Sequence, residues 1–226
     1  VIYPMLSQPM GFHYGANFPL EGDGSYDVTV SVGGMNTRRT GAFRGKFGEP
    51  AETTIVFEYS EAERNEIMFQ ETPEKAGERM ARQPMEMPMP QSILPPADQF
   101  PGTVRGTART GDADLVVTTL ASPPDGVDAP DESSYLAVSA RTPYNRMVLP
   151  AMGLEGTLTS GGETAFEGAL ERTLDPDLHY HYGAAVESVA GGDELELQVT
   201  IPPQVARHEG YETAFLEMPP TSLTLQ

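Results

Sequence analysis

The sequence contains no cysteine and no tryptophan, and only two of its 226 residues are lysines. Without cysteine, disulfides, zinc–thiolate sites and thiol nucleophiles are excluded, and cysteine usage leaves the redox compartment open. No run of about 18 apolar residues occurs, so we expect no membrane-spanning helix. The chain also does not open with a basic region followed by an apolar stretch, so we expect no signal peptide within it.

Positive charge is scarce, with 14 Lys and Arg against 33 Asp and Glu and a formal net charge of -19. A nucleic-acid partner is excluded because a phosphate backbone requires a basic footprint. An anionic membrane surface is disfavoured for the same reason. The acidic residues are spread along the whole chain, which is typical of the hydrated surface of halophilic proteins, although an acidic patch that recruits cations is an alternative.

Glycine and proline are frequent, with 23 and 21 residues, and they separate short runs rich in β-branched residues. In the clearest run, Tyr26, Val28, Val30 and Val32 alternate with polar residues, as in a half-buried strand. This spacing of strands and turns predicts an all-β protein made of antiparallel, sandwich-type sheets. The strands are expected at residues 25–32, 53–59, 113–120, 135–140 and 195–201.

The region between these groups of strands has a different composition. Residues 61–82 are rich in Glu, Ala, Arg and Met, which predicts one or two short helices interrupted at Pro73. The Pro/Met-rich run 83–91 predicts an extended linker. We therefore expect a β-sandwich unit at 1–59, a helical and then Pro/Met-rich linker at 60–100, and a second β-sandwich unit at 101–226.

A four-residue sequence occurs twice, as His-Tyr-Gly-Ala at 13–16 and again at 181–184. With a slip of one residue, the alternating strand 26–32 aligns with 195–201, and the Arg-Arg-Thr-Gly of 38–41 aligns with 207–210. Three features in register predict an internal duplication.

The two predicted copies differ in length before the shared motif. About 80 residues separate the linker from His181, whereas only 12 precede His13. We therefore expect the first unit to lack its opening strands, so that either the chain is a fragment or those strands come from elsewhere. An uncovered sheet edge would otherwise remain open to pairing.

The N-terminal motifs resemble those of the periplasmic iron-transport family, small copper- and iron-binding proteins that accompany iron permeases. The resemblance is carried by Tyr3-Pro-Met5, His13-Tyr-Gly-Ala-Asn17, Gly24-Ser-Tyr-Asp-Val28 and Arg38-Arg-Thr40. It implies an immunoglobulin-like β-sandwich, usually dimeric, that binds a copper or iron ion outside the cytoplasm. A membrane permease is the implied partner.

All four histidines lie at or beside the repeated motif, and imidazole is a common ligand of copper, zinc and iron. The thioethers of Met5 and Met10 would add a soft ligand suited to copper(I). We expect the better site in the second unit, where three imidazoles are available, because Arg39 places a cation in the first. The candidate ligands are His13, His179, His181, His208, Met5 and Met10.

Each candidate also has a structural interpretation. The histidines could be hydrogen-bonded loop residues whose motif is kept by tight turns at Gly15 and Gly183. The methionines 80, 85, 87 and 89 could present sulfurs to a soft ion, but packing of the linker against the domains is the favoured interpretation.

The sequence thus favours an extracytoplasmic protein that captures a metal ion and hands it on. The alternative is a structural or protein-interaction module that has lost metal binding, because the family's early His-Leu-Glu strand is absent and Arg39 replaces its histidine. We expect no enzyme, since no nucleophile elbow and no phosphate-binding glycine loop occur.

Overall fold

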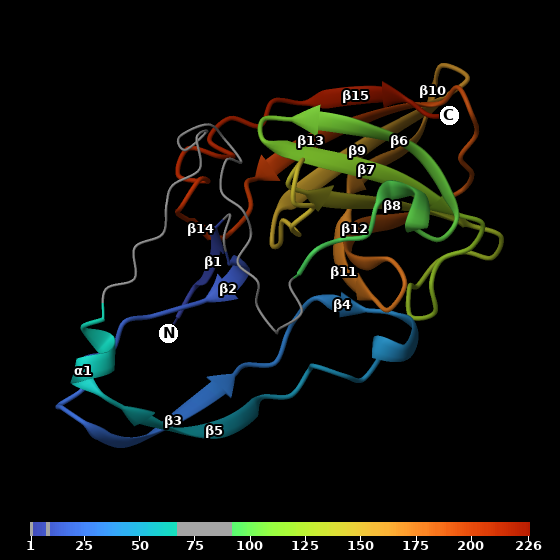
Figure 1. Cartoon of the computed structure of the whole chain (residues 1–226). Coiled ribbons are helices and arrows are strands. Elements are labelled where there is room, and N and C mark those ends of the chain that lie inside the picture. The colour runs from blue at the N-terminus through green and yellow to red at the C-terminus, as the bar shows by residue number, and fades with distance from the viewer. Residues whose placement is uncertain (1, 8–9, 67–91) are drawn as a thin grey trace.

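The computed structural model describes residues 2–7, 10–66 and 92–226, and strands dominate these residues (Figure 1). Within these residues, helical structure is limited to one α-turn, α1 (Glu61–Arg64), and two 3₁₀ turns, η1 (Gly41–Phe43) and η2 (Ala97–Gln99). The all-β, sandwich-type architecture expected from the sequence is confirmed. No helix in the described part of the chain is both long and apolar enough to cross a membrane.

The larger sheet has six strands in the order β4-β11-β12-β8-β7-β6. Its neighbours pair antiparallel, except that β4 runs parallel to β11. The strands are β4 (Arg38–Arg39), β6 (Thr103–Thr110), β7 (Ala113–Leu120), β8 (Ser134–Arg141), β11 (Glu171–Asp175) and β12 (His179–Val186).

The smaller sheet has four antiparallel strands in the order β10-β9-β13-β15. They are β9 (Gly153–Ser160), β10 (Glu163–Ala169), β13 (Glu194–Ile201) and β15 (Thr221–Thr224). Alternate residues of both sheets form one core, because successive side chains of a strand point to opposite faces. Its fully buried members include Leu115, Val117, Leu136, Leu158 and Leu195.

A second, smaller core covers the outer face of the six-stranded sheet. Leu94 and Phe100, from the segment around η2, pack there against Val116, Tyr135 and Leu178. Both faces of β7 and β8 are therefore buried, which explains why the apolar run of β7 is nearly continuous rather than alternating.

Two groups of N-terminal strands pair with strands of the C-terminal half, and a third group extends away from the sandwich. The hairpin of β1 (Pro4–Ser7) and β2 (Gly11–Tyr14) pairs through β1 with β14 (Ala206–Arg207), which runs parallel to it. Strand β4 extends the six-stranded sheet. Strands β3 (Gly24–Val32) and β5 (Ala51–Tyr59) form a long hairpin that extends away from the sandwich (Figure 1).

Residues 1–59 were expected to form a β-sandwich unit of their own, and the structure differs. The described N-terminal strands do not build two facing sheets; they form two hairpins and one edge strand. The short strands β1 and β4 find their parallel partners in the C-terminal half instead. The expected linker begins with α1, which Ser60 caps, and its Pro/Met-rich part with the methionines 80–89 lies outside the described residues.

Candidate metal centre

Two three-stranded motifs repeat the same arrangement in different parts of the molecule. Motif I consists of the β1–β2 hairpin and the parallel strand β14. Motif II consists of the β11–β12 hairpin and the parallel strand β4. Each motif therefore combines a hairpin from one half of the chain with a short strand from the other half.

Corresponding residues of the two motifs lie 168 positions apart, and their hydrogen bonds match. The backbone N–H of His208 donates to the Leu6 carbonyl over 3.1 Å, and that of Thr40 donates to the Leu174 carbonyl over 3.1 Å. His13 lies across from Met5 on its hairpin, and His181 lies across from Thr173. His13 and His181 therefore occupy equivalent positions.

The histidine rings of both motifs are oriented by the same contact. His13 Nδ1 lies 3.0 Å from the carbonyl oxygen of Gly11, and His181 Nδ1 lies 3.0 Å from that of His179. The two carbonyl-bearing residues share a left-handed backbone, with φ of 68° at Gly11 and 57° at His179. A carbonyl only accepts, so Nδ1 of each ring donates to it, and the Nε2 atom points away from this contact toward a second partner.

In motif I the Nε2 lone pair of His13 faces a second imidazole. The Nε2 atoms of His13 and His208 lie 3.4 Å apart, with ring centroids 5.3 Å apart. Two nitrogens bound to one ion at about 2.0–2.1 Å, with an angle between about 109° and 120°, are separated by about 3.3–3.6 Å. The two imidazoles are therefore spaced as ligands of a single ion.

Met5 adds a thioether to this pair. It lies opposite His13 on the hairpin, and a Cβ added to Gly15 would come 2.9 Å from the Met5 methyl carbon and 3.6 Å from the His13 ring. The missing side chain at Gly15 thus leaves room for Met5 beside the ring. Two imidazoles and one thioether form a soft ligand set that suits copper(I).

The three-imidazole arrangement expected in the second unit is not found. No three His, Cys, Asp or Glu side chains in the described part of the chain lie close enough together to hold a metal ion. His179 is exposed at the start of β12, His181 is fully buried, and His208 lies beside His13 instead. Met10 lies at the β1–β2 turn, where its backbone N–H donates to Ser7 Oγ.

In motif II the Nε2 lone pair of His181 is already used. The Tyr135 hydroxyl lies 3.0 Å from this nitrogen. Arg38 fills the remaining space, since its Nη2 donates to the Tyr135 hydroxyl and to the Gly183 carbonyl, each over 3.0 Å. Its Nε donates to Thr173 Oγ1 over 2.9 Å. A guanidinium thus supplies the positive charge at this position.

Burial fixes the protonation states in motif II. Loss of solvation lowers the pKa of His181 to about 4, so the ring is neutral near pH 7. Burial raises the pKa of the Tyr135 hydroxyl, and the Arg38 charge opposes this only in part. Burial also acts to raise the pKa of Asp175, but hydrogen bonds from Thr40 and two backbone N–H groups outweigh it and leave that pKa lowered.

The residues at the ligand positions explain the difference between the motifs. Thr173 of motif II stands where motif I has Met5, and Thr40 stands where motif I has His208. Thr40 donates to Asp175 Oδ2 over 2.6 Å. The sequence alignment placed Arg39 at the His208 position, but the structure shifts the register by one residue, and Arg39 Nη1 donates to the Met35 carbonyl away from motif I.

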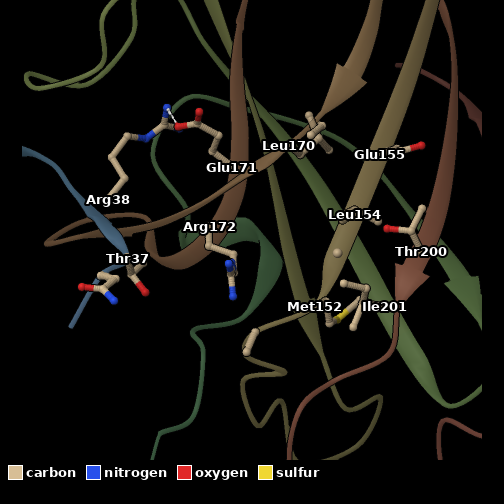
Figure 2. Close-up of a pocket in the computed structure, with 14 residues that line it drawn as sticks. Thr37, Arg38, Met152, Leu154, Glu155, Leu170, Glu171, Arg172, Thr200 and Ile201 are labelled. Atoms are coloured by element: carbon tan, nitrogen blue, oxygen red, sulfur yellow. Dashed lines mark hydrogen bonds and ion pairs between the residues drawn. The ribbon is translucent and has the colours of Figure 1, made fainter. Parts of the chain in front are cut away.

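A cleft of about 730 Å³ opens beside motif II (Figure 2). Arg38 and Glu171 form an ion pair at its rim, with 2.5 Å between Nη1 and Oε2. Met152, Leu154 and Ile201 line its apolar side. Because opposite charges and apolar side chains are mixed, the cleft does not define a ligand.

The fold and these motifs define a β-sandwich protein with a two-histidine, one-methionine cluster at its N-terminal hairpin. The chain belongs to the family described as Domain of unknown function (DUF7350), whose model matches residues 98–224. No curated protein matches the chain in sequence.

Two solved structures of FetP from uropathogenic Escherichia coli strain F11 are similar to the chain. One is a copper-bound variant, with 15% identity and a TM-score of 0.41 over 55% of this chain and 93% of FetP. The other is the protein as isolated, with 14% identity and a TM-score of 0.38 over 54% and 91% of the two chains.

Proposed function

We propose that the protein binds a transition-metal ion, copper or iron, through His13, His208 and Met5, outside the cytoplasm, and hands it on. The observation that carries the proposal is the 3.4 Å separation of the two Nε2 atoms beside a thioether. The sequence resemblance of the N-terminal motifs to periplasmic iron-transport proteins supports the same function. The resemblance also makes a permease partner part of the proposal.

The position of the cluster suits capture and release rather than permanent storage. His13 and His208 are half-buried and not enclosed by the core. His13 and His208 are 195 residues apart in the sequence, so an ion would join the N-terminal hairpin to the C-terminal segment. An ion that binds the folded protein and not the unfolded chain stabilises the fold by mass action. We propose binding, not catalysis, as the activity.

Titration calorimetry with copper(II) and iron(II), and a chelator competition with copper(I), test the proposal. One ion per chain is expected for the wild type, and His13→Ala or His208→Ala should weaken binding by at least about tenfold. Met5→Leu should weaken the binding of copper(I) more than that of copper(II), because only the soft ion depends on the thioether.

A matched control is His179→Asn, which removes an exposed imidazole while keeping a residue that tolerates positive φ. It should leave the affinity unchanged. Equal loss in His179→Asn and His13→Ala, or no uptake of any of these ions by the wild type, would refute the proposal.

A module that has kept the fold and lost the metal is the second candidate. It is favoured by the absence, within the described residues, of any group of three His, Cys, Asp or Glu ligands. Its expected result in the same titrations is no binding above that of the His13→Ala variant.

A further inference from the structure

The β3–β5 hairpin repeats the β13–β15 hairpin of the smaller sheet. Ser25 pairs with Glu58 and Val28 with Ile55, while Glu194 pairs with Thr224 and Leu197 with Thr221. The first strands are related by 169 positions and the second strands by 166 positions at both pairs. The two hairpins therefore share one register.

The same positions are buried in one hairpin and exposed in the other. Leu195 and Leu197 of β13 are 0% and 1% exposed and belong to the main core. Val28, at the position of Leu197, is 39% exposed. One face of β3–β5 is largely apolar, with Thr53 across from Val30 as a polar exception, and we call it the receiving face; its large apolar residues include Tyr26, Val28, Val30, Ile55 and Phe57.

The opposite face of the same hairpin is mainly polar, with Val56 across from Asp27 as its apolar exception. It carries Asp27, Thr29 and Ser31 on β3, and Ser31 Oγ donates to Glu52 of β5 over 2.7 Å. This alternation is that of a strand with one face on a core and one in water. The hairpin thus has the pattern of a buried sheet, but nothing in the described residues covers its receiving face.

Strand edges differ between the hairpins in the same way. The second edge of β13 pairs antiparallel with β9, whereas that of β3 has no neighbour among the residues that the structure describes. The hairpins of the two motifs show the same contrast. The edge of β12 that does not face β11 pairs with β8, whereas the corresponding edge of β2 is free within the described residues. Tyr14 of β2 is 64% exposed, and its counterpart Tyr182 is 0% exposed.

We propose that a β-rich polypeptide segment from outside these 226 residues docks on the β3–β5 hairpin. It adds an antiparallel strand to the free edge of β3, as β9 does for β13, and covers the receiving face with aliphatic side chains, as the six-stranded sheet does for Leu195 and Leu197. Main-chain pairing supplies affinity in such β-augmentation, and alternate side chains supply selectivity.

A second copy of the chain cannot supply its β9 or β8, the strands that pair with the equivalent hairpins within the fold. Both edges of its β9 are already paired, with β10 and β13, and both edges of its β8 are paired with β7 and β12. Two β3 edges could pair with each other, but the resulting four-stranded sheet would leave both receiving faces uncovered. An anionic membrane is disfavoured by the net charge of -19.

The test uses the whole chain and a synthetic peptide with the sequence of residues 153–169, the β9–β10 hairpin, followed by amide NMR. We expect binding that perturbs β3 amides. Val28→Asp with Val30→Asp should weaken it at least about tenfold, because two charges would lie on the receiving face. The matched control for the single variant Val28→Asp is Thr29→Asp, which places the same charge on the polar face of the same strand, across from Thr54, and should bind like the wild type.

Three outcomes would overturn the proposal. The first is no binding of the peptide up to about 1 mM, because a dissociation constant above that value means a binding free energy smaller than about 4 kcal/mol. The second is a dimer in sedimentation that the Val28→Asp, Val30→Asp variant abolishes, which would assign the face to a second copy. The third is binding to vesicles of anionic lipid that depends on the same two valines. None of these outcomes depends on metal binding, so this proposal is tested independently of the metal site.

Discussion

Motifs I and II have the same backbone hydrogen bonds but different surroundings at the Nε2 atom of their central histidine. In motif I this atom faces the imidazole of His208 beside Met5. In motif II it accepts from Tyr135 in a network closed by Arg38. Motif I brings two imidazole nitrogens together beside a thioether, whereas motif II holds its imidazole nitrogen in a hydrogen bond with Tyr135. The comparison teaches that the histidine motif alone does not define a metal site; the proposed site depends on the residues at the positions of Met5 and His208 as well.

The glycines at equivalent places in the two motifs should respond very differently to an added methyl group. A Cβ on Gly183 would lie 2.2 Å from the Tyr135 hydroxyl oxygen, and Tyr135 is fully buried and cannot move away. Gly183→Ala should therefore destabilise the protein by about 3 kcal/mol. In Gly15→Ala only the end of the flexible Met5 side chain must shift, so we expect less than about 1 kcal/mol. Urea unfolding of both variants measures this, and equal losses would contradict the difference in packing around the two glycines.

Arg38 should stabilise motif II although it is an ionised side chain. Arg38→Ala removes a charged donor from the Gly183 carbonyl and from the Tyr135 hydroxyl, which should cost about 2–3 kcal/mol. Arg44→Ala is the control, because its ion pair with Asp125 is exposed and should contribute less than about 1 kcal/mol. If Arg38→Ala unfolded at the same urea concentration as the Arg44→Ala control, the network would have no structural role.

The buried His181 should make stability depend on pH. The unfolded chain takes up a proton below about pH 6.5, whereas folded His181 stays neutral down to about pH 4. The free energy of unfolding should therefore fall by about 2 kcal/mol between pH 7.5 and pH 5, from this residue alone. His181→Gln should flatten this part of the curve.

Denaturant midpoints at several pH values measure this contribution. His179→Asn, which removes the exposed imidazole two residues away, should keep the slope. An unchanged slope in His181→Gln would show that His181 is not the residue responsible.

Added salt should have the smallest of these effects on stability, and it should stabilise both motifs equally. The formal charge of -19 is spread over the chain, and its repulsion is screened as the Debye length falls to roughly 3 Å near 1 M salt. Melting temperatures of the wild type should rise by at least a few degrees, roughly 5 °C, between 0.1 M and 2 M salt. Melting curves that do not move would argue against a halophilic adaptation.

The sequence predicts the local features well. Alternation of Tyr26, Val28 and Val30 with polar residues predicts strand β3, and the repeated His-Tyr-Gly-Ala predicts the shared geometry of His13 and His181. These features depend on near neighbours along the chain, whose periodicity is visible without a structure.

The partner of each hairpin was not predictable in the same way. Strand β14 has only two residues and pairs in parallel with a strand 201 positions earlier, and so short a segment carries no periodic signal. The sequence prediction placed His208 with His181 because both lie in the C-terminal half of the chain, whereas in the structure each hairpin pairs with a strand from the other half. The one signal that could have indicated this was the repeat itself, since two copies that lie side by side can exchange equivalent strands.

The central claim is that motif I, and not motif II, holds the metal ion. The most direct measurement is NMR of ¹⁵N-labelled histidine during titration with silver(I), a diamagnetic stand-in for copper(I). The account predicts that the Nε2 resonances of His13 and His208 shift together and saturate at one ion per chain, while those of His181 stay in place. A shift of His181 at the same ratio, or no shift of His13 and His208, would contradict it.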